Sequence, residues 1–137
     1  MRDKKFLGAA SAALMIVIVA TLVLAPAAAA ASKYKGLHAF HVTDGANPDA
    51  SLIFDAAGNL YGTTSAGGDP GCDCGVAFEL SPNGGGAWYE SVLHTFGSIP
   101  DGSYPYYGMT PDGMGNFFGT TATGGHHQQG TVFELTP

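Results

Sequence analysis

Positive charge is scarce in this sequence of 137 residues. Beyond residue 31 only Lys33 and Lys35 remain, against ten carboxylates, and there is no arginine. A nucleic-acid partner needs a basic surface that neutralises phosphates, so nucleic acid is excluded as a partner. An acidic surface of this kind also disfavours phosphate groups and anionic lipids as ligands.

Helical periodicity and catalytic motifs are lacking as well. No window after residue 31 repeats its apolar residues every 3.6 positions, and glycine makes up 20 of those 106 residues, which favours turns and close backbone packing. There is no Gly-x-Ser-x-Gly elbow, no His-Glu-x-x-His, no phosphate-binding loop and no dinucleotide fingerprint. We therefore predict an all-β protein, favour a non-catalytic role and expect no cofactor.

Long apolar runs are confined to the N-terminus. Three basic residues among the first five precede an apolar stretch over 6–25, which Pro26 ends before an alanine-rich run over 27–31. These are the three parts of a signal peptide, so we predict a cleaved signal helix over 1–31 and a secreted or cell-surface protein. The alternative is an uncleaved membrane anchor, because about 20 apolar residues span a bilayer. The protein would then contact a membrane only through this segment.

One glycine-rich phrase occurs twice. Gly58–Gly68 reads GNLYGTTSAGG, and Gly115–Gly125 reads GNFFGTTATGG, 57 positions later. The pattern Leu-His-x-Phe also recurs, at 37–40 and 93–96, and so does a Phe-Glu-Leu run. Two similar structural units therefore follow one another along the chain.

Each unit reads as a small antiparallel sheet. In the first unit, the apolar pattern and the turn residues predict strands over 51–55, 60–64, 76–80 and 88–96. Gly58 falls in a turn that needs a positive φ. Four-stranded antiparallel units of this length in tandem are typical of propeller blades. We predict two blade-like repeats that form part of a β-propeller.

The repeats divide the chain into parts. An N-terminal strand and its connection occupy 34–50, a first blade-like repeat 51–96, and a second 97–137, which lacks its fourth strand. A counterpart of that strand lies at 34–40, which carries the same Leu-His-x-Phe pattern. Two units leave open faces and an unpaired edge. We therefore expect self-association through these edges, and a natural product longer than the sequence given.

The repeated phrases resemble a known bacterial family. The run G-T-T-x-x-G-G followed by G-x-x-F-E-L is similar to the GloVer tandem repeat of bacterial exported proteins, and the likeness covers 37–137. A looser likeness connects the glycine doublets and Trp88 with kelch blades. The resemblance implies an extracellular, propeller-like array with no established catalytic residues. This sequence holds two units where relatives usually hold more, and it shows no anchor segment after them.

Two pairs of repeated residues invite catalytic or metal-binding interpretations. His38 and His94 occupy matching positions, as do Glu79 and Glu134 on the third strand of each unit. Catalytic zinc takes three protein ligands at one point, and a glycosidase needs two carboxylates that flank one bond. Positions that repeat with the fold usually serve the fold. We therefore interpret the histidines as structural and the glutamates as solvent-facing.

The two cysteines interrupt the repeat. Cys72 and Cys74 lie in a six-residue loop, 69–74, where the second unit has only His126, His127 and two glutamines. Two cysteines in an exported protein ordinarily pair, and a Cys-x-Cys loop closes a disulfide if the Cα atoms approach within about 7 Å. Free thiols are an alternative. If the two loops converge, two thiolates and two imidazoles would make a zinc site.

Aromatic side chains are the remaining candidates for a binding surface. They are Trp88, Tyr89, Tyr104, Tyr106 and Tyr107. Exposed aromatic faces stack on sugar rings, which predicts a surface module that binds a glycan or another cell-surface protein. Packing between units is the alternative role for Trp88 and for at least one of the tyrosines. A carbohydrate- or peptide-acting hydrolase or lyase built on a propeller is the alternative function.

Overall fold

The computed structural model describes residues 32–97 and 99–137. All the strands described here belong to one compact unit, Lys35–Pro137. The predicted signal helix over 1–31 lies outside the described residues. Within the described part every regular element is a strand and every strand pairing is antiparallel, which confirms the all-β prediction. No helix in that part is long and apolar enough to cross a membrane.

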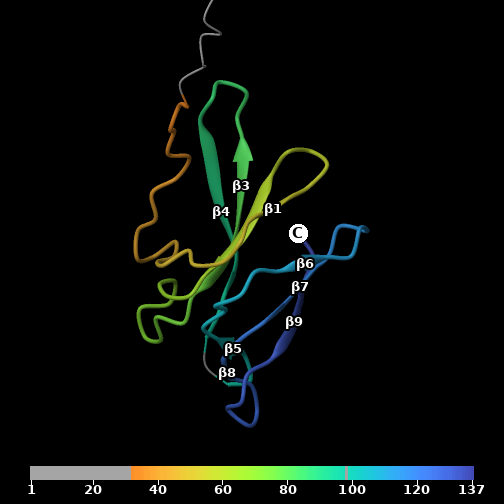
Figure 1. The fold of residues 1–137 in the computed structure, drawn as a ribbon. Helices are drawn as coiled ribbons and strands as arrows, with labels where there is room; N and C mark the ends of the chain where they lie inside the picture. The colour runs from red at the N-terminus through yellow and green to blue at the C-terminus, as the bar shows by residue number, and fades with distance from the viewer. Residues whose placement is uncertain (1–31, 98) are drawn as a thin grey trace, which may run out of the picture. The chain divides into compact units, whose positions relative to one another are not determined.

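The first repeat forms a four-stranded sheet (Figure 1). Its strands, which neighbour one another in chain order, are β1 (Ile53–Phe54), β2 (Leu60–Thr64), β3 (Val76–Pro82) and β4 (Trp88–Thr95). In this register Leu80 of β3 lies opposite Leu60 on one side and Glu90 on the other. Strand β2 has the predicted bounds, β3 is two residues longer than predicted, and β4 is one residue shorter.

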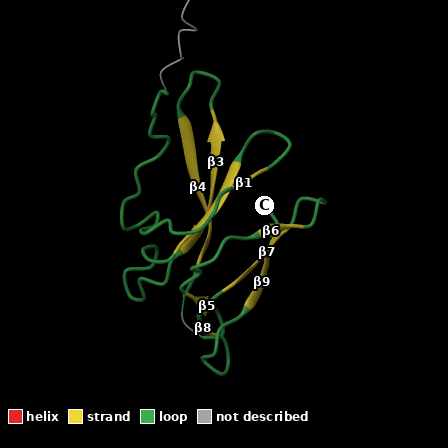
Figure 2. Cartoon of the chain, in the orientation of Figure 1, coloured by secondary structure: helices red, strands yellow, loops and turns green. Residues whose placement is uncertain are grey.

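The second repeat forms a three-stranded sheet (Figure 2). Its strands, in the order β6-β7-β9, are β6 (Thr110–Pro111), β7 (Phe117–Thr120) and β9 (Val132–Leu135). A separate pair joins β5 (Gly102–Ser103) to β8 (Thr123–Gly124). Within the described residues β9 pairs with β7 alone, so its outer edge is open where β3 has β4 as its neighbour.

The same turn closes the first hairpin of each sheet. Asp55 Oδ1 accepts hydrogen bonds from the main-chain N–H groups of Ala57 at 2.8 Å and Asn59 at 2.9 Å, and the Asn59 side-chain amide donates to Oδ2 at 2.9 Å. Asp112 accepts the corresponding bonds in the second repeat. Gly58 has a φ of 89°, a left-handed conformation that glycine adopts without steric cost.

Each sheet receives a phenylalanine from the segment that precedes it. Phe40 packs edge-to-face on Phe78 of the first sheet, with ring centroids 4.9 Å apart. Phe96 packs in the same way on Phe133 of the second sheet, at 5.1 Å. On the other face of the first sheet, the ring of Tyr61 joins an apolar cluster that contains residues of both repeats. Side chains that recur in the sequence therefore hold the two sheets together.

The N-terminal segment corrects one prediction. The sequence predicts a strand over 34–40, but the structure has no strand there. Leu37 and Phe40 instead pack against the apolar cluster on the first sheet, and Lys35 Nζ donates to the Gly86 carbonyl. A strand must share its main-chain hydrogen bonds with a sheet edge. This segment lies over a sheet face, so burial of its side chains decides its path.

Candidate functional site

A groove opens between the two repeats beside the cysteine loop. Its volume is about 390 Å³. The first repeat contributes Cys72 and Cys74, and the second repeat contributes residues around β5 and β8, including Tyr104, Thr123 and Gln128. A concave surface with aromatic and apolar groups and a few polar ones is the usual form of a ligand site.

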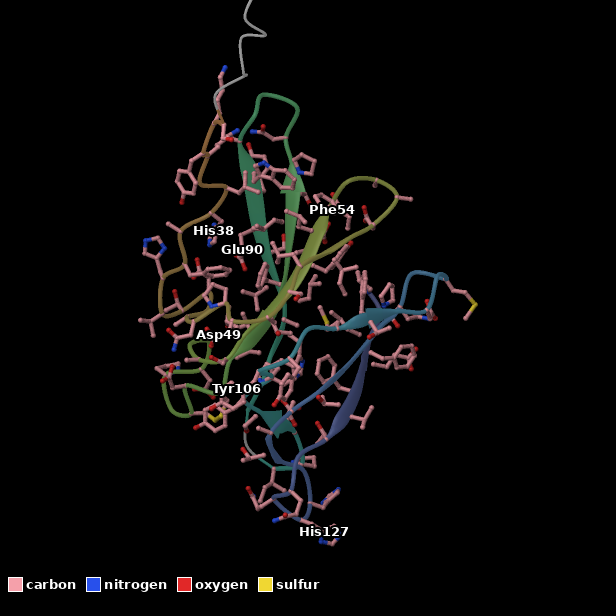
Figure 3. The ribbon with its side chains drawn as sticks, viewed as in Figure 1. His38, Asp49, Phe54, Glu90, Tyr106 and His127 are labelled. Carbon is pink, nitrogen blue, oxygen red and sulfur yellow. A yellow bond between two sulfur atoms is a disulfide. The ribbon has the colours of Figure 1, made fainter. Side chains whose placement is uncertain are left out.

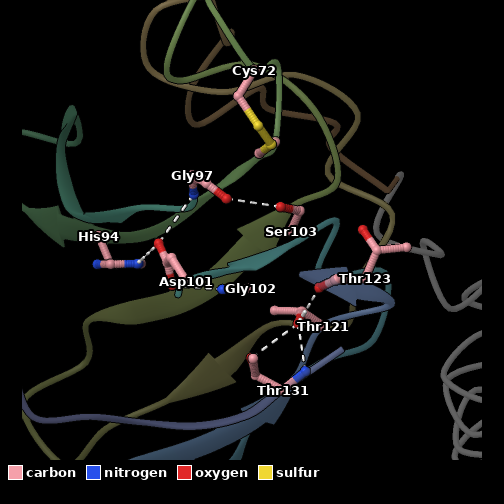
Figure 4. Close-up of polar contacts among 10 residues, drawn as sticks. Cys72, His94, Gly97, Asp101, Gly102, Ser103, Thr121, Thr123 and Thr131 are labelled. Carbon is pink, nitrogen blue, oxygen red and sulfur yellow. Dashed lines mark hydrogen bonds and ion pairs between the residues drawn. A yellow bond between two sulfur atoms is a disulfide. The ribbon is translucent and has the colours of Figure 1, made fainter. Parts of the chain in front are cut away.

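The cysteine loop is closed by local bonds (Figure 4). Cys72 and Cys74 form a disulfide across Cα atoms 5.1 Å apart. The Asp69 carbonyl accepts the N–H of Cys72 at 3.1 Å and that of Asp73 at 2.7 Å, and Asp73 Oδ1 accepts the N–H of Gly67 at 2.6 Å. Cys74 is buried beside Phe96. The loop therefore presents a fixed wall to the groove.

The segment that carries Tyr104 and Tyr106 lies across the groove from the cysteine loop and is anchored through its main chain. Tyr104 N–H donates to the Cys74 carbonyl at 2.9 Å, and the Tyr104 carbonyl accepts the N–H of Ala122 at 3.1 Å. The hydroxyl of Thr63, on β2, donates to the Pro105 carbonyl at 3.1 Å. The bonds to Cys74 and from Thr63 cross from one repeat to the other, so they fix the segment against the first repeat.

The structure brings two of the predicted aromatic residues together. The rings of Tyr104 and Tyr106 are stacked, with centroids 6.2 Å apart and planes inclined by 15°. The Tyr106 side chain remains 48 % exposed, and the adjacent Tyr107 is more exposed still. Trp88 and Tyr89 lie elsewhere, at the start of β4, where Trp88 packs against the core of the first sheet. Only part of the predicted surface thus borders the groove.

A histidine–aspartate pair precedes each sheet. Ahead of the second sheet His94 Nε2 lies 2.9 Å from Asp101 Oδ2, and the same oxygen accepts the N–H of Gly97 at 3.0 Å (Figure 4). Ahead of the first sheet His38 Nε2 lies 3.3 Å from Asp44 Oδ2. Each ring also packs edge-to-face on the phenylalanine two residues later. The pair holds the segment that leads into each sheet.

Glu90 distinguishes the first pair from the second. It projects from β4 beside His38 and Asp44 (Figure 3). Burial raises the pKa of the Glu90 carboxyl, the charge of Asp44 raises it further, and His38 lowers it in part. The side chains of His38 and Asp44 are 18 % and 23 % exposed, whereas that of His94 is 44 % exposed. The sequence analysis missed Glu90, although a carboxylate on the buried phase of a strand is an unusual residue.

The predicted zinc set is not assembled. The sulfur atoms of Cys72 and Cys74 are joined to each other, and His126 and His127 are exposed in their own loop. Within the described part of the chain, these four residues do not form a cluster of potential ligands. The physical reason is that the two loops close on themselves.

The repeated glutamates occupy separate sheets. Glu79 lies on β3, where its Oε1 accepts a hydrogen bond from the Ser81 hydroxyl at 2.8 Å. Glu134 lies on β9 and is exposed. Glu79 is half-buried rather than solvent-facing, because it shares its face of the sheet with Tyr61, the residue opposite it in the register.

A second, larger cleft lies between the two hairpin turns. Its volume is about 520 Å³, and its walls are residues 54–57 of the first repeat and 111–117 of the second. The lining is mainly apolar, and its carboxylate, Asp55, already accepts hydrogen bonds from the turn and from the Tyr61 hydroxyl. Few polar groups are left to orient a ligand there.

A family model for the Gloeobacter/Verrucomicrobia repeat matches residues 23–137, which include both sheets and both histidine–aspartate pairs. The chain belongs to this family. This match confirms the family resemblance that the doubled glycine phrase indicates, so the chain is a Gloeobacter/Verrucomicrobia repeat protein. A comparison with curated proteins found no match, and neither did a comparison with solved structures.

Proposed function

We propose that this repeat protein is an exported, non-catalytic module whose two blade-like units hold a binding groove for a neutral glycan. The proposal rests on the stacked pair Tyr104–Tyr106 beside the groove. The two ring centroids lie 6.2 Å apart, and Tyr106 stays exposed to solvent. A large aromatic surface that folding leaves exposed is typical of an interaction site.

The chemistry of the groove favours a sugar. A glycan offers apolar ring faces, which stack on tyrosine, and hydroxyl groups, which bond to polar side chains such as Thr123 and Gln128. The acidic composition of residues 32–137, with ten carboxylates against two lysines, disfavours an anionic polymer. Because the main chain of Tyr104 is already fixed, binding would lose little conformational entropy at this site.

Two features support the exported location. The N-terminal sequence has the basic, apolar and small-residue parts of a signal peptide. A disulfide between Cys72 and Cys74 persists in an oxidising compartment, outside the cytoplasm. The stacking of a four-stranded sheet and a three-stranded sheet through Tyr61 and Phe117 supports the blade-like arrangement, since propeller blades pack in this way.

Binding of the purified protein to an array of defined glycans tests the proposal. The variant Tyr104→Asn/Tyr106→Ala removes both rings, and asparagine suits the backbone because Asn47 has nearly the same φ at the matching position, 55° against 62°. We expect at least one neutral glycan to bind, and the variant to lose about tenfold or more in affinity. Tyr89→Ala, which removes an exposed tyrosine outside the groove, should bind as the wild type does.

Three results would contradict the proposal. Equal binding by the wild type and the double variant would show that the glycan does not bind at the groove. A failure of every neutral glycan to bind would exclude neutral glycans as the ligand and favour a protein partner. Release of a shortened sugar, abolished by substitution of a single carboxylate, would establish a hydrolase or lyase instead.

A further inference from the structure

Three potential metal ligands meet at the N-terminal side of the first sheet, outside the groove. His38 and Asp44 come from the segment before β1, and Glu90 comes from β4. One ligand atom from each lies within 4.8 Å of the other two, and His38 Nε2 is 3.3 Å from Asp44 Oδ2. Figure 3 shows His38 and Glu90 beside each other on neighbouring segments.

Two atoms of this cluster lack partners. His38 Nε2 and Glu90 Oε1 are shielded from solvent, and neither has a hydrogen-bond partner among the described residues. Although His38 Nε2 approaches Asp44, the ring is not directed at the carboxylate as a hydrogen bond requires. Buried polar atoms without partners are rare in folded proteins and call for an explanation such as a bound ion.

We infer that His38, Asp44 and Glu90 bind a divalent transition-metal ion, with Zn²⁺ as the best match. Zinc accepts imidazole nitrogen and carboxylate oxygen, at about 2.0–2.2 Å from the metal. Tetrahedral ligands at that distance lie roughly 3.4 Å from one another. The observed separations, up to 4.8 Å, therefore need only a small closure of flexible side chains.

The ligand types distinguish this site from one for calcium or magnesium. Calcium takes six to eight oxygen ligands and magnesium keeps an octahedral shell that is rich in water. An imidazole with two carboxylates is instead a set that zinc and its neighbours in the first transition row bind well. The ion would also neutralise the repulsion between Asp44 and Glu90.

The ion would act as a clamp. The segment that carries His38 and Asp44 has no strand pairing before the Ala46–Ala66 bridge. Phe40 lies within it and covers Phe78. A metal bond to Glu90 would tie this cover to β4, in addition to its side-chain packing, the bond from Lys35 to Gly86 and the main-chain bond from Gly68 N–H to the Val42 carbonyl at 2.7 Å.

The pair that leads into the second sheet does not form the same cluster. His94 and Asp101 are paired at 2.9 Å and Glu134 of β9 lines the same cleft, but among the described residues these three side chains do not form a group of potential ligands. A cleft of about 250 Å³, lined by both residues and by β9, lies beside the open edge where β3 has β4. We therefore expect one ion per chain, bound at His38.

Calorimetric titration of the chelator-treated, purified protein with zinc chloride tests the inference. The wild type should bind one Zn²⁺ per chain. Glu90→Gln, which keeps the shape of the side chain, should lose about tenfold or more in affinity. His94→Gln, the matched change in the second repeat, should leave both affinity and stoichiometry unchanged, as should His126→Gln/His127→Gln, which removes the exposed histidines.

Thermal unfolding provides an independent readout. Zinc should raise the Tm of the wild type but not that of Glu90→Gln. Without metal, Glu90→Gln should melt at the same temperature as the wild type or higher, because it removes an unpaired carboxylate from beside Asp44. Equal zinc affinity for wild type and Glu90→Gln would overturn the inference, as would loss of binding in His126→Gln/His127→Gln or no binding at all.

Discussion

Ahead of the first sheet His38 lies beside Asp44 with Glu90 completing the group, whereas ahead of the second sheet His94 lies beside Asp101 with an open cleft next to them. The histidine and the aspartate recur because they hold the segment that enters each sheet. The third residue comes from β4, and among the described residues no strand takes the corresponding place beside β9. A shared pair thus becomes a different site when one neighbouring strand is present or absent.

The groove shows the same division between shared framework and local difference. Asn47 and Tyr104 occupy matching positions with φ angles of 55° and 62°, and each carbonyl accepts the N–H two residues later, at 2.9 and 3.0 Å. The backbone is therefore conserved between the repeats. The side chains are not, because Tyr104 and Tyr106 stand where the segment before the first sheet has Asn47 and Asp49. Repeated residues build the sheets, and the proposed glycan site uses side chains that differ between the two units.

The largest expected effect on stability is at Phe96, and it is compared with the effect at Phe40 in the N-terminal segment that covers the first sheet. Phe96 is only 1 % exposed and packs on Phe133, so Phe96→Ala should reduce the free energy of unfolding by about 3–5 kcal/mol. Phe40, its counterpart on the first sheet, is half-buried, and Phe40→Ala should cost clearly less. Urea unfolding of the two variants measures the difference. Equal losses would show that the two phenylalanines do not differ in importance.

A second test concerns the open side of the second sheet. Val132 is 79 % exposed and lies on β9, an edge strand whose outer side has no partner among the described residues. We expect the purified protein to self-associate through this edge, and Val132→Lys to shift it towards the monomer, since charge blunts edge pairing. Met114→Lys, which adds the same charge at an exposed residue in the turn between β6 and β7, is the control. Sedimentation of a compact, stable wild-type monomer would contradict the expectation.

A smaller effect is expected at the hairpin turns. Gly58 and Gly115 have φ angles of 89° and 104°, whereas Gly85 in the longer turn does not have a positive φ. A side chain in the left-handed conformation costs roughly 1 kcal/mol or more. Gly58→Val and Gly115→Val should therefore each lower the Tm more than Gly85→Val does. Equal shifts at the three positions would count against the turn assignment.

The weakest expected effect is a shared dependence on acid. Burial raises the pKa of Asp55, but hydrogen bonds from Asn59, Ala57 and Tyr61 outweigh it, so the pKa lies below its ordinary value of 3.8. Main-chain and side-chain hydrogen bonds also lower the pKa of Asp112.

Because these pKa values are lower in the folded state, the stabilisation by both turns is complete above about pH 4 and is lost as the pH falls through the folded values. The variant Asp55→Asn/Asp112→Asn should be less stable than the wild type at pH 7 and should lose less stability on acidification. Urea midpoints at pH 7 and pH 3 measure both. An equal loss in wild type and variant would assign the acid sensitivity to other groups.

Sequence periodicity was sufficient for the strands that carry their own pattern. The strand over 60–64 and the turn at Gly58 were predicted correctly, because local alternation and turn chemistry determine them. The strand predicted over 34–40 was wrong, since its Leu-His-x-Phe pattern also suits a segment that lies across a sheet face. Whether such a segment becomes a strand depends on a free edge nearby, and a local pattern does not contain that information.

The candidate sites depended on contacts between distant residues. Glu90 meets His38 across 52 positions of the sequence, and Tyr104 borders a groove whose other wall is the cysteine loop. The sequence identified the cysteines as a departure from the repeat and the tyrosines as candidate binding residues, but it did not place them together. Glu90 was detectable only as a charge on the buried phase of β4.

The division between repeated framework and unrepeated site is tested most directly by amide chemical-shift mapping of the purified protein. The titrant is the neutral glycan that binds most tightly on the array. We predict that the perturbed amides cluster at 72–74, 99–107 and 123–128, around the groove. Perturbations centred instead on the repeated turns at 55–59 and 112–116 would place the ligand in the larger cleft and contradict the account.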